Sequence, residues 1–140
     1  MPCVLWISGD FTSEEIISNT QLLPYKFIAK GETVAVKTGG EKTYERALCG
    51  FDVSEKDFTD FKALVADAQA YLEGNYEHLS ALPKLKDMTA RLDFGYYTSF
   101  MDQRIVAQYD SLPHRLLRLA GELQIDIELS QYWHSDATPN

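Results

Sequence analysis

Histidine and cysteine side chains are the groups in this sequence best suited to metal binding or nucleophilic chemistry. The chain has three histidines, His78, His114 and His134, and two cysteines, Cys3 and Cys49. Metal ligands usually recur at close spacings such as HxxxH or CxxC, and none of these five residues is spaced in that way. Both cysteines have apolar neighbours, which favour the neutral thiol over the reactive thiolate. We therefore expect no metal site, no cofactor and no catalytic cysteine.

Two glycine-containing segments have the composition of anion-binding loops. Residues 38–42 contain a glycine pair but lack the GxxxxGK[ST] pattern and join two expected strands, so a hairpin turn is expected there. Residues 8–10 do precede an expected helix, whose N-terminus could receive an anion. The carboxylates of Glu14 and Glu15 lie at that same helix start and would repel a phosphate.

The strongest pattern is an alternation of apolar and polar residues in an expected strand, residues 123–130, with the sequence LQIDIELS. Since successive strand side chains point to opposite faces of a sheet, Asp126 and Glu128 share one face while leucine and isoleucine occupy the other. A sheet with one apolar and one acidic, hydrated face is typical of a two-layer α+β protein.

A second expected strand, residues 89–97, carries Arg91, Asp93 and Tyr97 on one of its faces. If the two strands lie close together, one polar surface gathers five candidate binding residues: Arg91, Asp93, Tyr97, Asp126 and Glu128. Paired carboxylates can act as acid and base when burial separates their pKa values. Alternation predicts exposure instead, so we expect a solvated or partner-binding face and no catalytic residues.

Periodicity and turn residues predict the elements that position this surface. The first half has expected strands at 3–8, 25–30, 33–37 and 44–52, and a helix at 13–21 behind a capping box from Thr12 to Glu15. A second capping box at 54–57 predicts a long helix, with an apolar stripe of Phe58, Phe61, Val65, Ala68 and Leu72.

The second half adds a strand, a helix and a final strand. Residues 105–109 are expected to form the strand, and Asp110 or Ser111 to cap the helix, whose end fits Gly121 in a left-handed conformation. The element order predicts a ferredoxin-like βαββαβ core with an additional strand-helix-strand, a mostly antiparallel sheet and helices packed on one face. We expect a single domain over 1–133 and a flexible C-terminal tail over 134–140.

Four short motifs resemble a bacterial family known as domain of unknown function 4279. They are Ile7-Ser8-Gly9-Asp10, Leu23-Pro24, Lys30-Gly31-Glu32 and Leu119-Ala120-Gly121. The sequence departs from the family at residues 48–50, where members usually carry an aromatic residue. The resemblance implies a small α+β bacterial protein, and it transfers no reaction and no ligand residues.

The charge of the chain limits its partners. Thirteen basic against 21 acidic residues give a net charge of −8, and no Lys or Arg follows Arg118. This balance argues against nucleic acids and anionic membranes, which bind clustered cations, and favours a basic protein partner. Solubility alone is the alternative explanation.

The apolar run at the N-terminus is too short for a signal peptide and no stretch could span a bilayer, so we expect a cytoplasmic location.

We therefore expect a non-enzymatic protein-binding module, for example an immunity or inhibitor protein that neutralises a basic toxin. A small-ligand-binding sensor domain of ferredoxin-like type is the alternative, and an enzyme is the third hypothesis because no catalytic motif is found. A free edge strand could also support a homodimer.

Overall fold

One mixed sheet of five strands, in the order β2-β5-β1-β6-β7, forms the centre of the computed structural model, which describes residues 2–133. The strands are β1 (Cys3–Gly9), β2 (Lys26–Ile28), β5 (Ala47–Ser54), β6 (Thr89–Tyr97) and β7 (Ile125–Tyr132). Neighbouring strands are antiparallel except for β6 and β7, which are parallel. The expected α+β class and mostly antiparallel sheet are confirmed.

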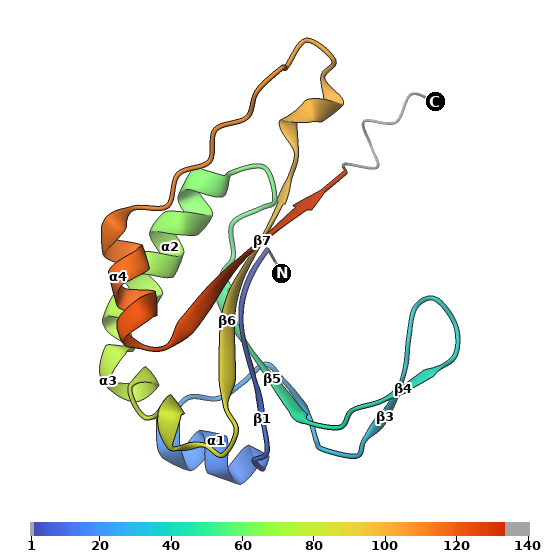
Figure 1. Cartoon of the computed structure of the whole chain (residues 1–140), viewed down its shortest axis with the longest axis vertical. Helices are drawn as coiled ribbons and strands as arrows, with labels where there is room; N and C mark the ends of the chain where they lie inside the picture. The colour runs from blue at the N-terminus through green and yellow to red at the C-terminus, as the bar shows by residue number, and fades with distance from the viewer. Residues whose placement is uncertain (1, 134–140) are drawn as a thin grey trace.

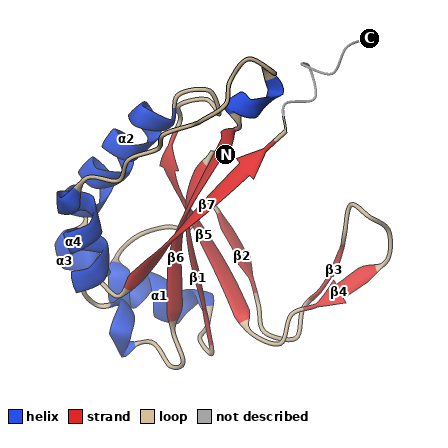
Figure 2. Cartoon of the chain, turned by 45° about the horizontal axis from the view of Figure 1, so that its top comes forward, coloured by secondary structure: helices blue, strands red, loops and turns tan. Residues whose placement is uncertain are grey.

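The helices lie on one face of this sheet (Figures 1 and 2). They are α1 (Ser13–Thr20), α2 (Phe61–Gly74), α3 (Tyr76–Leu79) and α4 (His114–Glu122), with 3₁₀ turns η1 (Leu82–Lys84) and η2 (Ser99–Met101). The short strands β3 (Thr33–Ala35) and β4 (Glu41–Thr43) form a separate hairpin that projects away from the helices (Figure 1). Among residues 2–133, no helix has both the length and the apolar character needed to cross a bilayer.

The core lies between the sheet and the helices. Leu5 and Ile7 of the central strand β1 are fully buried, as are Leu64 and Leu72 of α2. In β7, Ile125 is buried and the carboxylates alternate to the other face, as the sequence pattern predicts. Leu129 departs from the pattern with 45% exposure.

The second expected capping box is not formed, and this prediction is wrong. Ser54 still belongs to β5, and its hydroxyl donates to Asp67 Oδ2 at 2.6 Å. Helix α2 begins at Phe61, where the side chain of Asp60 accepts from the Ala63 amide at 3.0 Å. Tertiary pairing with β1 extends β5 beyond the point where local capping residues predicted a helix.

The expected strand at 105–109 is also wrong, because these residues form an irregular segment. Side-chain hydrogen bonds hold this segment instead: the Gln108 side-chain carbonyl accepts from the Ser99 amide at 2.6 Å, and the Asp110 carboxylate accepts from the Tyr96 hydroxyl at 3.0 Å. Gly121 lies inside α4, and the left-handed residue after that helix is Gln124, with φ of 59°. The expected loose tail, 134–140, lies outside the described residues.

Candidate functional site

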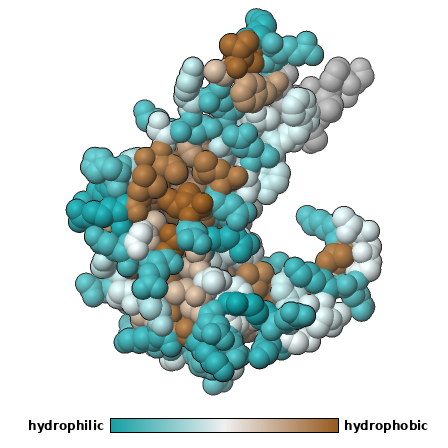
Figure 3. All heavy atoms as spheres, viewed as in Figure 1, coloured by the Kyte–Doolittle hydropathy of each residue, from teal (hydrophilic) through white to brown (hydrophobic). Residues whose placement is uncertain are grey.

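The face of the sheet opposite the helices carries the candidate site. The outline of the molecule is concave on this side, between the end of β7 and the β3–β4 hairpin (Figures 1 and 3). Strand register places Asp52 of β5, Val4 of β1, Asp93 of β6 and Glu128 of β7 in one row across this face. Helices cover the other face; within this row Glu128 is exposed, Asp52 and Asp93 are half-buried, and Val4 between them is buried.

Strands β6 and β7 bring four of the five predicted binding residues together. Arg91 pairs in register with Asp126, and Asp93 pairs with Glu128. The Ser130 hydroxyl donates to Asp93 Oδ1 at 2.6 Å. Since the two strands are direct neighbours, the charged side chains form one continuous surface.

The charge of Arg91 is directed to Glu128. Arg91 Nε lies 3.2 Å from Glu128 Oε2, which is close enough for an ion pair, although the angle does not meet hydrogen-bond geometry. Three carboxylates on β6 and β7, from Asp93, Asp126 and Glu128, outnumber the one guanidinium. The β6–β7 side is therefore acidic.

The fifth predicted residue, Tyr97, belongs to an aromatic cluster on one side of the acidic row, farther along β6 from Asp93. Its ring lies 5.2 Å from that of Phe58, which makes an edge-on contact with Tyr132 at 6.3 Å. Gly95 leaves room for these rings, because a Cβ atom there would lie 3.2 Å from Tyr132 and 3.3 Å from Phe58. Aromatic rings therefore border the carboxylates at this end.

A second aromatic pair, Trp6 and Tyr25, borders the row on its other side and was not among the predicted site residues. The ring centroids lie 6.2 Å apart, and the rings lie over Gly50, where a Cβ atom would meet Trp6 at 2.8 Å. The sequence placed Trp6 in the expected strand 3–8, but only the register reveals that Gly50 lies beside it.

Asp52 lies two positions along β5 from Gly50 and was also missed. Its Oδ1 is buried and has no hydrogen-bond partner among the described residues. The pKa of Tyr25 is raised, mainly by burial and further by the negative charge of Asp52. A carboxylate therefore lies close to the aromatic pair, an arrangement suited to a positively charged group.

The part of this face that lies near the β3–β4 hairpin is basic. A hollow of about 370 Å³ near the hairpin is lined by Lys42, Arg46 and Arg91 together with Ser8 and Glu45. Arg46 donates to the backbone carbonyls of Ser8 and Asp87, so its guanidinium is engaged within the fold. The face that the sequence predicted to be acidic is thus negatively charged over β6 and β7, and its charge becomes positive toward the hairpin.

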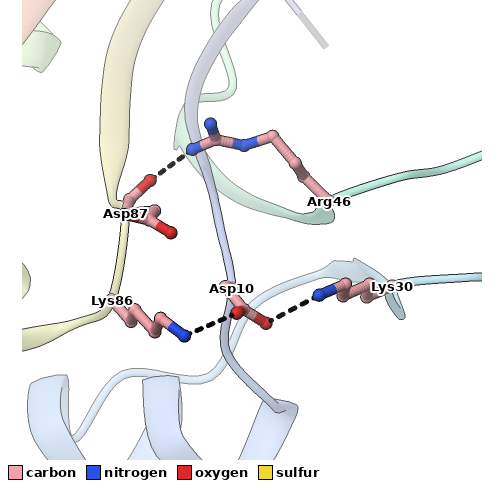
Figure 4. A network of polar contacts seen from close by, with 5 residues as sticks. All are labelled: Asp10, Lys30, Arg46, Lys86 and Asp87. Carbon is pink, nitrogen blue, oxygen red and sulfur yellow. Dashed lines mark hydrogen bonds and ion pairs between the residues drawn. The ribbon is translucent and has the colours of Figure 1, made fainter.

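Asp10, in the segment with the composition of an anion-binding loop, is engaged by two lysines (Figure 4). Lys30 Nζ lies 3.4 Å and Lys86 Nζ 3.3 Å from its carboxylate oxygens. Hydrogen bonds from the two lysines lower the pKa of Asp10, and the one from Lys86 has the larger effect. These contacts hold the turns before α1, β3 and β6 together, which is a structural role.

Neither cysteine has the surroundings of a nucleophile. Cys3 and Cys49 are both free and buried. Burial raises the pKa of Cys49 to about 12, and burial together with nearby carboxylates raises the pKa of Cys3. Within residues 2–133, no group of three or more His, Cys, Asp or Glu side chains could hold a metal ion, and His134 lies outside this range.

An apolar hollow of about 650 Å³ lies on the helical side, away from the predicted residues. Phe61, Val65 and Ala66 of α2 form one wall, and Tyr109 and Pro113 of the irregular segment form the other. The segment is held by Asp110, whose carboxylate accepts from the Tyr96 hydroxyl at 3.0 Å. Such a volume suits a small organic molecule.

Comparisons with known proteins found no matching family model, no matching curated protein and no matching solved structure.

Proposed function

We propose that this protein is a non-enzymatic binding module that receives a basic protein partner on the acidic β6–β7 side of its uncovered sheet face. The observation that carries the proposal is the group of three carboxylates that the register of β6 and β7 brings together, from Asp93, Asp126 and Glu128. A surface of one charge attracts a partner of the opposite charge and accelerates the encounter. The net charge of −8 acts in the same direction.

The aromatic clusters on either side of the carboxylates support a protein partner over a small cation. Tyrosine and tryptophan are frequent anchors of protein interfaces because they combine large apolar area with a polar group. Trp6 and Tyr25 lie at one side of the acidic row, and Tyr97 and Tyr132 lie at the other. A partner with lysine or arginine between apolar side chains would match this arrangement.

Charge reversal tests the proposal. The variant Asp126→Lys/Glu128→Lys should lose basic proteins that the wild type captures from an extract of its own cells. Glu14→Lys/Glu77→Lys is the matched control, because it changes the net charge equally at exposed positions of α1 and α3. We expect the control to capture the same proteins as the wild type. Equal capture by both variants would show that the acidic face does not bind these proteins.

The core of this module is proposed to be ferredoxin-like, and the strand order β2-β5-β1-β6 with antiparallel neighbours supports this assignment. We further propose a bacterial cytoplasmic location, which the two buried free thiols support because a reducing compartment keeps cysteines unpaired. An immunity or inhibitor protein against a basic toxin is one form of such a module. Membership of the family known as domain of unknown function 4279 stays a prediction.

A small-ligand sensor is the second candidate, and the 650 Å³ hollow beside α2 favours it. The apolar wall of Phe61 and Val65 would hold the body of an organic molecule. Fluorescence titration with the dye anilinonaphthalene sulfonate tests whether the native hollow accepts such a molecule. Ala66→Trp, which fills the hollow from an exposed position, should abolish the fluorescence increase, and an unchanged increase would argue against this site.

A further inference from the structure

Strand β7 is the outermost strand of the sheet and has a neighbour on one side only. It spans eight residues, Ile125–Tyr132, and its register with β6 runs without a bulge from the first residue to the last. It contains no proline and no lysine, which are two usual means of protecting a sheet edge, and its charged residues, Asp126 and Glu128, are both acidic. The free edge of β7 therefore offers a regular template for another strand.

The backbone groups that form this edge can be identified. The carbonyl of Tyr132 accepts from the Thr98 amide at 3.0 Å, so the backbone of Tyr132 is directed to the β6 side. Backbone groups alternate in direction along a strand, and residues two positions apart point the same way. The amide and carbonyl groups of Ile127, Leu129 and Gln131 are therefore directed away from the sheet.

The side chains beside this edge have different chemistry on the two faces. Asp126 and Glu128 are exposed on the uncovered face, and Leu129 is 45% exposed on the helical face. Apolar side chains gather between α2 and β7 in the space-filling view (Figure 3). An added strand with alternating basic and apolar residues would place its cations near the carboxylates and its apolar side chains near Leu129.

A second copy of this chain fits the edge less well. The residues of β7 include two acids and no base, so pairing β7 with itself would bring four carboxylates to one seam. Each copy also carries a net charge of −8. Like charges across neighbouring strands are destabilising, whereas a basic strand would neutralise the acids.

We infer that the basic partner binds by strand addition, placing an extended segment of alternating basic and apolar residues along the free edge of β7. This inference rests on the proposed function and specifies its partner. The backbone groups of Ile127, Leu129 and Gln131 form hydrogen bonds with the main chain of the partner segment, and the carboxylates of Asp126 and Glu128 attract its basic side chains. Main-chain hydrogen bonds supply affinity in this mode of recognition, and alternate side chains supply specificity.

The probe is a synthetic peptide with the length of β7, eight residues of alternating lysine and valine, capped at both ends. Hydrogen exchange followed by NMR provides the readout. The amides of Leu129 and Gln131 should exchange at least about tenfold more slowly with bound peptide, because they gain hydrogen bonds. Ser130, two positions from Tyr132 and therefore directed to β6, is the control within the same strand and should change little.

Two methylated peptides separate strand addition from charge attraction. In an extended peptide the lysine amides lie along one edge and the valine amides along the other. One peptide is N-methylated at the lysines and the other at the valines, so both keep the same charge. A peptide bound in one orientation, parallel or antiparallel, presents only one edge to β7, so one methylated peptide should bind more weakly than the other.

The outcomes distinguish this inference from the proposed function. Binding that is lost in Asp126→Lys/Glu128→Lys but is equal for the two methylated peptides overturns strand addition and leaves the acidic face as the site. Binding that is unchanged in this variant contradicts the proposed function as well. No binding of the unmethylated peptide, or a dimer of the protein alone with slow exchange at Leu129, overturns the inference.

Discussion

Arg91 Nε lies 3.2 Å from Glu128 Oε2, although the residue directly across from Arg91 in the parallel pair is Asp126. The guanidinium therefore makes a diagonal contact along β7. The structure gives Asp126 no ion pair within residues 2–133, so its negative charge is not compensated locally. Asp126 therefore keeps its full negative charge for a basic group of a partner, whereas Glu128 shares its charge with Arg91.

We expect the Arg91–Glu128 pair to contribute little to stability. The two side chains are 43% and 51% exposed, and such pairs are worth about 0.2–1 kcal/mol because water and salt screen them. Glu128→Gln should lower the free energy of unfolding by no more than about 1 kcal/mol, and less at high salt. Urea unfolding at two salt concentrations measures this, with Asp126→Asn as the control. A larger loss that persists in salt would contradict the assignment of an exposed pair.

Gly50 should tolerate no side chain, because Trp6 and Tyr25 lie over it. A Cβ atom would lie 2.8 Å from Trp6 and 3.0 Å from Tyr25. Gly50→Ala should displace the indole ring, lower the free energy of unfolding by about 1–3 kcal/mol and alter the tryptophan fluorescence. Gly121→Ala is the matched control: it lies in α4 with open space around the added atom, and should stabilise by about 0.5–1 kcal/mol. A neutral Gly50→Ala would indicate that the ring does not lie against this glycine.

Two adjacent leucines of α4 should respond very differently to the same substitution. Leu116 is fully buried, whereas Leu117 is 47% exposed. Leu116→Ala should cost about 2–5 kcal/mol through lost burial and the cavity left behind. Leu117→Ala should cost less than about 1 kcal/mol. Denaturant midpoints of the two variants test which face of α4 packs on the sheet, and equal losses would contradict the orientation described.

Alkaline pH should destabilise the protein. Burial raises the pKa of Cys49 from 9.0 to about 12, so the folded state keeps a proton that the unfolded state releases. The contribution of this thiol is fully present below about pH 9 and is lost as the pH rises toward about 12. Urea unfolding between about pH 8 and about pH 11 should show this decline.

Cys49→Ala provides the control for the alkaline experiment. It should unfold more easily at every pH, but its loss of stability with rising pH should be shallower than in the wild type. Cys3, whose pKa is also raised, should account for part of the remaining decline. The same slope in the variant and the wild type would show that Cys49 does not titrate differently on folding.

Much of the fold could be predicted from local pattern. Period-two alternation predicted β6 over 89–97 with its observed bounds, and it correctly assigned the buried side of Ile125 and the exposed side of Asp126. The helix cap at Thr12 was also correct, since Thr12 Oγ1 accepts from the Glu15 amide at 3.2 Å. These features depend on residues a few positions apart.

Errors arose where a distant segment decided the outcome. Ser54, a good helix cap by sequence, is held in β5 because it pairs with Cys3 of β1. Residues 105–109 have the composition of a strand, yet Gln108 and the adjacent Asp110 are held by hydrogen bonds from Ser99 and Tyr96. Pairing and side-chain contacts with other segments cannot be evaluated from a short window of sequence.

The alternation of acids and apolar residues in β7, and with it a charged face of the sheet, could be read from the chain without coordinates. The parallel pairing of β7 with β6, the contact of Arg91 with Glu128 and not Asp126, and the rings of Trp6 and Tyr25 over Gly50 emerge only when the whole chain is folded. The reason is physical: the direction of a side chain follows from backbone geometry within one strand, whereas its neighbours depend on strand order and register, which packing of the whole chain selects.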